Sequence, residues 1–322
     1  GPTNVSLTAP NKAKEGSRVT LTASATVANG RKIKSYTWIV GNNTQTTTDP
    51  SYQVTIPSYD VDNPNLKVKV KVTDSANKTA ESKESSVGIE VDATIAGPTN
   101  ASISGANEAK EGTQVALTAS ATVANGRKIK AYKWTVEGGK TETTTTANFT
   151  FTARNFDASK ENQSVSLVVV DSAGKESQAA TKNVKITADS TISGPTNVSL
   201  TAPNKAKEGS RVTLTASATV ANGRKIKSYT WIVGNNTQTT TDPSYQVTIP
   251  SYDVDNPNLK VKVKVTDSAN KTAESKESSI GIEVDATIAG PTNASISGAN
   301  EAKEGTQVAL TASATVANGR KI

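Results

Sequence analysis

Residues 66–74 have the sequence LKVKVKVTD, in which apolar and polar side chains alternate. Successive side chains of a β-strand point to opposite faces, so the leucine and the three valines would share one buried face. A helix would distribute them around its circumference. The segment therefore predicts a strand with one face in a core, and the same nine residues return at 259–267.

The whole chain repeats in the same way. The tetrad GPTN begins at Gly1, Gly97, Gly194 and Gly290, so the long period, from Gly1 to Gly194, is 193 residues. A fixed internal period of this kind indicates a tandem array of structural units. We expect two related kinds of module and an incomplete last one, at residues 1–96, 97–193, 194–289 and 290–322. Because the chain begins and ends at positions set by the repeat, we expect it to be a window cut from a longer protein.

Each complete repeat contains several such alternations, separated by turn residues such as Asn29-Gly30. Seven short strands with turn signals about every 8–12 residues are typical of an antiparallel sandwich. The sequence thus predicts an all-β protein of tandem immunoglobulin-like, seven-stranded β-sandwiches in a linear rod. Trp38, Trp134 and Trp231 occupy the same place in their repeats and are the expected core anchors.

Two segments resemble PKD-type domains. Residues 34–38 (KSYTW), followed by a turn containing glycine, are similar to the Y-x-W-x-x-G-x-G region, and residues 165–174 (VSLVVVDSAG) to V-x-L-x-V-x-D-x-x-G. Residues 15–21 (EGSRVTL) are shared with many bacterial Ig-like domains. The Gly-Asp-Gly of the PKD family is absent, since residues 41–43 are GNN and 137–139 are EGG. The resemblance implies a PKD-like or bacterial Ig-like array in a giant repetitive bacterial or archaeal surface adhesin or filament protein.

The composition argues against an enzyme. The chain has no Cys and no His, which removes nucleophilic pairs of the Ser-His and Cys-His type and makes a zinc site improbable. We expect no catalytic residues, no cofactor and no metal. No apolar run is long enough for a membrane span. The net charge of +7 suits an acidic polysaccharide, but the interspersed charges favour a role in solubility, with no specific nucleic-acid partner.

Calcium is the one metal for which the sequence offers candidate ligands, because Asp60 and Asp62 present oxygen atoms at alternate positions and Asp92 lies just before the next repeat. The second repeat has Asn155 and Asp157 in the corresponding loop. No glycine-rich, aspartate-dense loop is present, so we favour aspartates that cap their own loops.

The connection between repeats is short, since residues 91–98 run from the last strand of one module into the first strand of the next. Ile95 is apolar and Pro98 fixes its own φ, and the segment lacks flexible Gly/Ser runs. We expect a semi-rigid junction. The alternative is that Ile95 merely completes the core of its own module.

Two surface features stand out. The first is a loop at one pole of each module that could contact the adjoining module or a neighbouring chain: Asn29, Gly30, Arg31 and Lys32, with Asn125, Gly126, Arg127 and Lys128. The second is a basic stripe that could bind acidic polysaccharide or dock a filament, although such lysines more commonly prevent strands from pairing: Lys67, Lys69 and Lys71, with Lys260, Lys262 and Lys264.

These features predict the structural repeat region of an extracellular, cell-surface filament protein, acting as a semi-rigid spacer in adhesion, biofilm or cell–cell linkage. Its expected partners are the neighbouring modules and other copies of the filament. One alternative is a self-assembling fibre joined by strand complementation, suggested by the incomplete last module. A second is an array of carbohydrate-binding modules, for which Tyr59 and Tyr252 would be the exposed aromatic residues.

Overall fold

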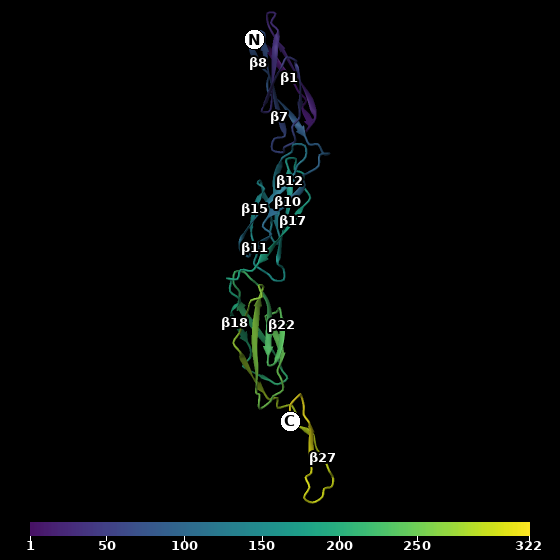
Figure 1. Ribbon diagram of the computed structural model, residues 1–322, viewed down its shortest axis with the longest axis vertical. Helices are drawn as coiled ribbons and strands as arrows, with labels where there is room; N and C mark the ends of the chain where they lie inside the picture. The colour runs from purple at the N-terminus through teal and green to yellow at the C-terminus, as the bar shows by residue number, and fades with distance from the viewer. The chain divides into compact units, whose positions relative to one another are not determined.

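The computed structural model describes residues 1–322, and all of its regular elements are β-strands (Figure 1). Contacts divide the chain into two compact units, Gly1–Ala109 with Thr113–Ala153 and Asn162–Lys185, and Lys110–Gly112 with Arg154–Glu161 and Ile186–Ile322. The division passes through the second repeat. The whole first repeat therefore belongs to one unit and the whole third repeat to the other.

The first repeat is a two-layered sandwich. Its nine strands are β1 (Thr3–Thr8), β2 (Lys12–Lys14), β3 (Arg18–Thr26), β4 (Ile33–Val40), β5 (Asn43–Thr47), β6 (Ser51–Thr55), β7 (Asn65–Asp74), β8 (Thr79–Glu81) and β9 (Ser85–Glu90). One sheet has the order β1-β3-β6 and the other β2-β9-β7-β4-β5, with β8 paired to β7. The expected strands form, and the three-residue strands β2 and β8 are additions that the alternation is too short to reveal.

One edge of the sandwich differs from the purely antiparallel arrangement that we expected. Strand β2 pairs with β9 in parallel, with Lys12 opposite Gly88 and Lys14 opposite Glu90. Pro10 lies between β1 and β2 and has no N–H to donate, so the first ladder stops there. The chain then crosses to the other sheet, so the segment that forms β1 in one layer continues as β2 in the other.

The core lies between the two sheets, and β7 supplies its largest apolar row, Leu66, Val68, Val70 and Val72, all buried. Trp38 on β4 has no exposed surface and stacks on Tyr52 of the opposite sheet, with ring centroids 5.8 Å apart. Its Nε1–H donates to Thr47 Oγ1 at 2.9 Å, so the one polar atom of the indole is satisfied. The last strand ends at Glu90, and Val91, the first residue of the connecting segment, is exposed.

The second repeat has the same architecture. Its strands are β10 (Thr99–Gly105), β11 (Glu108–Lys110), β12 (Gln114–Thr122), β13 (Ile129–Val136), β14 (Thr141–Thr144), β15 (Asn148–Thr152), β16 (Asn162–Asp171) and β17 (Ala180–Thr187). Strands β10-β12-β15 form one sheet, and β17-β16-β13-β14 are neighbours in the other. Trp134 is fully buried and stacks on Phe149 at 4.9 Å.

The third repeat reproduces the first. Its strands are β18 (Thr196–Thr201), β19 (Lys205–Lys207), β20 (Arg211–Thr219), β21 (Ile226–Val233), β22 (Asn236–Thr240), β23 (Ser244–Thr248), β24 (Asn258–Asp267), β25 (Thr272–Glu274) and β26 (Ser278–Glu283). Trp231 is fully buried in its core. Residues 290–322 form only the pair β27 (Thr292–Gly298) and β28 (Leu310–Thr315), on which Ile296 and Leu310 are exposed.

Candidate functional site: the joints between repeats

A tight turn between the third and fourth strands of each complete repeat presents an arginine. In the second repeat, Asn125 and Gly126 both have positive φ, 50° and 72°, and the N–H of Arg127 donates to the carbonyl of Ala124 at 3.0 Å. Positive φ at both central residues is the requirement of a type I′ turn, which is why Asn-Gly suits it. The turn directs the Arg127 side chain towards the end of the preceding sandwich.

Arg127 binds a glutamate of the first repeat with two parallel hydrogen bonds. Its Nη2 lies 2.7 Å from Glu15 Oε1 and its Nε lies 3.2 Å from Glu15 Oε2, while Nη2 also donates to the carbonyl of Asp92 at 3.2 Å. On its other side, Nη1 donates to Asp171 Oδ2 of its own repeat at 3.1 Å. All three charged side chains are 1% exposed or less, so one buried guanidinium joins carboxylates from two sandwiches.

The backbone completes the coordination of both carboxylates. Glu15 accepts the N–H of Tyr59 and of Asp92, each at 2.8 Å, and Asp171 Oδ1 accepts two amides of its own turn, each at 2.9 Å. Burial raises the pKa of Glu15, but the hydrogen bonds from Arg127, Tyr59 and Asp92 outweigh that effect and hold the pKa below its ordinary value of 4.5. Glu15 is therefore ionised at neutral pH.

Further bonds cross the same joint. Ser172 Oγ donates to the carbonyl of Tyr59 at 2.7 Å, and the N–H of Val61 donates to the carbonyl of Ser172 at 2.9 Å. Lys175 Nζ donates to the carbonyls of Ala93 and Ile95, both in the connecting segment. Side-chain and backbone hydrogen bonds thus tie each sandwich to the other, which restricts bending as well as separation.

The arrangement recurs at the next two joints. Arg224 Nη2 lies 2.7 Å from Glu111 Oε1 and Arg320 Nη2 lies 2.6 Å from Glu208 Oε1. The hydrogen bond from Arg320 is the main reason why the pKa of Glu208 falls to about 2. The corresponding Arg31 of the first repeat pairs only with Asp74 of its own turn, at 3.0 Å, and its side chain is 40% exposed.

Of the two predicted contact loops, the one in the second repeat lies in a joint and the one in the first repeat does not. Arg127 and the carbonyl of Asn125, which accepts Ser58 Oγ at 2.5 Å, lie in the first joint, with Gly126 beside Ser58. Lys128 is held through its N–H, which donates to Ser172 Oγ at 3.3 Å. Asn29, Gly30, Arg31 and Lys32 form the same turn on the first repeat and contact no other repeat in this chain.

The basic stripe is paired with acidic side chains. Lys67 lies 3.2 Å from Glu84, Lys69 forms a salt bridge with Glu81, and Lys71 lies opposite Glu81 in the ladder. Lys260 and Lys262 pair in the same way with Glu277 and Glu274, and Lys264 lies opposite Glu274. Their strands, β7 and β24, lie inside their sheets, so the lysines do not protect a sheet edge as we had suggested.

The remaining predicted residues have separate roles. Asp60 Oδ1 accepts the N–H of Asp62 at 3.0 Å, Asp92 Oδ1 accepts the N–H of Thr94 at 2.9 Å, and Asp62 pairs with Lys130 across the joint at 3.0 Å. Ile95 is buried in the connecting segment. Tyr59 and Tyr252 pack against their cores, so they do not provide the exposed aromatic platform expected of a carbohydrate-binding module.

Our sequence interpretation did not identify Glu15 or Asp171 as partners of Arg127. It placed the glutamate in a turn and the aspartate in a family motif. The signal was present in the repeat itself, because a glutamate recurs at 15, 111 and 208 and an arginine at 127, 224 and 320, always 112 or 113 residues later. A constant separation that spans a repeat boundary points to contacts between repeats.

The strands and joints define a protein of tandem β-sandwich domains of the immunoglobulin type. Comparison with solved structures finds the fibronectin(III)-like modules of Clostridium thermocellum CbhA, which are 19% identical over 60% of this chain and 92% of that chain, with a TM-score of 0.24. It also finds the FN1–FN3 domains of chicken CNTN1, 12% identical over 88% of this chain and 98% of that chain, with a TM-score of 0.32. Neither the protein-family models nor the curated proteins give a match. The chain contains no helix with the length and apolar character needed to cross a bilayer.

Proposed function

We propose that the chain is the structural repeat region of an extracellular surface protein and acts as a semi-rigid spacer in adhesion, biofilm formation or cell–cell linkage. The observation that carries the proposal is the arginine that pairs with a glutamate of the preceding repeat at each boundary and is buried at the first two. A spacer needs domains that resist rotation about their connections, and a short linker alone would leave that freedom.

The chemistry of the joint suits this task. A buried ion pair adds little net stability compared with an apolar contact of the same shape, but it demands one geometry, because any displacement leaves a charge without its partner. The planar guanidinium meets Glu15 through two parallel bonds, which fixes orientation as well as distance. Bending at the first joint would break both bonds together with the backbone bond between Val61 and Ser172.

Spin labels can measure the stiffness of this joint. The chain has no cysteine, so Thr20→Cys and Thr118→Cys would place one label on an exposed strand position of each of the first two repeats. We expect a narrow distance distribution between the labels, and a broad one when Arg127→Ala is added. A broad distribution with Arg127 intact would overturn the spacer proposal. Antibody labelling of intact cells of the source organism tests the surface location, and exclusively intracellular staining would contradict it.

A further inference from the structure

The edge strands of the first sandwich differ in how they are protected against pairing with another chain. An exposed edge is a template for a further strand, and proteins block it with lysine, proline, a bulge or a very short strand. Strand β2 has three residues, two of them lysines, and β1 has a bulge between Thr3 and Ser6. Strand β6 lies between Pro50 and Pro57. Strand β5, which ends the larger sheet, has the sequence NTQTT and none of these features.

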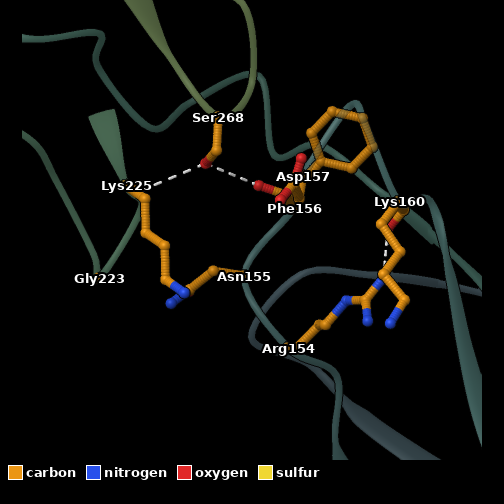
Figure 2. Close-up of a pocket in the computed structure, with 8 residues that line it drawn as sticks. All are labelled: Arg154, Asn155, Phe156, Asp157, Lys160, Gly223, Lys225 and Ser268. Carbon is orange, nitrogen blue, oxygen red and sulfur yellow. Dashed lines mark hydrogen bonds between the residues drawn. The ribbon is translucent and has the colours of Figure 1, made fainter. Parts of the chain in front are cut away.

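The joints use the ends of the repeats, so a second copy of the chain has more room at the edges. At the second joint, Ser268 Oγ accepts the N–H of Lys225 at 3.4 Å and donates to the carbonyl of Phe156 at 2.9 Å (Figure 2). The N–H of Ala158 donates to the carbonyl of Ser268 at 2.8 Å. Loops of two repeats thus engage each other within one chain, whereas β5 and β22 end their sheets without a further strand.

The surroundings of these two strands are almost free of charge. In a chain in which 20% of residues are charged, Asp49 is the only charged residue from 35 to 59, and Asp242 the only one from 228 to 252. Two copies can therefore approach along this edge without repulsion between like charges. We propose that β5 and β22 pair with the same kind of strand in a second copy of this chain. This partner goes beyond the spacer function and does not depend on it.

The register of β5 decides which of its backbone groups are available. Val40 lies opposite Asn43 across a two-residue turn. Residues of an antiparallel pair alternate between facing the partner strand and facing away, so the N–H and C=O groups of Thr44 and Thr46 point away from β4. The carbonyl of Thr46 accepts Nε2 of Gln45 at 3.4 Å, which is longer than an ordinary N–H···O bond. A backbone N–H of a second strand would be a better donor.

Side chains hold the strand in this shape. The hydroxyls of Thr46 and Thr37 lie 3.0 Å apart. Thr47 Oγ1 accepts Nε1–H of Trp38 at 2.9 Å and donates to the carbonyl of Asp49 at 2.8 Å. The equivalent bonds in the third repeat have the same lengths. An edge that is already fixed loses little conformational freedom when a partner binds.

A second copy of the same strand fits this edge. When two β5 strands pair antiparallel about a two-fold axis, Thr44 of each lies opposite Thr46 of the other, and each such pair can exchange both backbone bonds. The two Gln45 residues then meet on the axis, with their Cα atoms about 4.5 Å apart. A glutamine amide offers donors as well as an acceptor, so the two side chains can bond to each other.

The second repeat contains a residue that opposes this pairing. In β14, Glu142 lies opposite Trp134, in the place that Gln45 takes opposite Trp38. Two copies of β14 paired in the same way would bring two carboxylates together on the axis, and like charges directly opposite each other are destabilising. We therefore expect pairing through the first kind of repeat and not through the second.

Sedimentation of the whole chain over a range of concentrations tests the proposal. The unchanged chain should associate reversibly. Gln45→Glu with Gln238→Glu should raise the dissociation constant about tenfold or more, because it places carboxylates on both edges. Thr20→Glu with Thr213→Glu adds the same charge at exposed positions of β3 and β20, which lie inside their sheets, and should change the constant little. Glu142→Gln should strengthen association, since it removes the opposing charge from a third edge.

Hydrogen exchange locates the contact. The amides of Thr44 and Thr46 should gain protection as the concentration rises, while those of Thr141 and Thr143 in β14 should not. A chain that stays monomeric up to about 1 mM would overturn the proposal. Equal effects of the edge and control variants, or association without protection of Thr44 and Thr46, would overturn it as well, because the contact would then lie elsewhere. Near-ultraviolet circular dichroism establishes that each variant is folded, and Glu142 shows that this fold accepts glutamate at the substituted position.

Discussion

Replacing Arg127 by alanine isolates the contribution of the joint. The substitution removes the two bonds to Glu15, the bond to Asp92 and the bond to Asp171, and leaves two carboxylates buried without a counter-charge. Removing one partner of a buried pair costs about 3–5 kcal/mol. This cost reduces the free energy needed to open the joint. The sandwich cores on either side, centred on Trp38 and Trp134, keep their stability because the substitution does not touch them.

Hydrogen exchange of individual amides measures this opening. The N–H of Val61 bonds across the joint, and those of Tyr59 and Asp92 bond to Glu15. We expect their protection to fall by roughly two to three and a half orders of magnitude in Arg127→Ala. Amides of β16 in the second core should keep theirs. The protection of these amides in Arg127→Lys should lie between that of the unchanged protein and that of Arg127→Ala, since an ammonium group cannot reproduce the planar pair of bonds.

The chain contains a matched control. Arg31 occupies the same turn in the same local sequence but pairs only with Asp74, so Arg31→Ala removes the same side chain without breaking a joint. We expect at most a few-fold change in protection at its own turn. Unchanged protection of Val61, Tyr59 and Asp92 in Arg127→Ala, or equal effects of the two substitutions, would refute the view that the buried arginine holds the sandwiches together.

Three further outcomes are expected. The pKa of Glu208 is lowered to about 2, so the stability that its ionised carboxylate gives to the third joint is complete above the ordinary value of 4.5 and is lost as the pH falls towards 2. Hydrogen exchange of the Tyr252 and Asp285 amides, which bond to Glu208, should report loosening of the joint over the same pH range. Loosening above pH 5 would contradict this assignment. Trp38→Ala should destabilise the first repeat by about 3–5 kcal/mol and leave the third repeat unchanged, as measured by hydrogen exchange of the equivalent amides in β7 and β24; a matching loss in the third repeat would be inconsistent with separate cores. Val87→Ile should stabilise the first repeat by about 0.5–1.5 kcal/mol, because Ile280 fills the same buried position in the third; exchange of equivalent amides in β9 and β26 compares them, and a loss of stability would mean that the two cores differ.

The strands could be predicted from the sequence because the signal for them is local. Alternation along residues 66–74 decides which face of β7 is buried, and Asn29-Gly30 specifies a turn by the φ angles that it tolerates. The three-residue strands β2 and β8 carry too few apolar residues to give such a signal. The parallel pairing of β2 with β9 depends on where the chain goes after Pro10, which no periodicity describes.

The candidate sites divide in the same way. The sequence drew attention to the turn that carries Arg127, but it also offered, as less favoured alternatives, the lysines of β7 as a binding surface and Tyr59 as an exposed aromatic residue. The folded structure brings Glu84 and Glu81 to the first two of these lysines and packs Tyr59 against the core. Charge and exposure depend on neighbours that are distant in the chain, so a list of basic or aromatic residues does not identify a surface.

The sequence by itself determined that this protein is a series of β-sandwiches, since the repeat, the period-two pattern and the turn residues are properties of short segments. Only the tertiary structure decided what joins them. Glu15 and Arg127 are separated by 112 residues and Arg127 and Asp171 by 44, so no pattern within a short segment links the three side chains. Folding two sandwiches and placing one after the other brings the three together, and burial then makes their pairing obligatory.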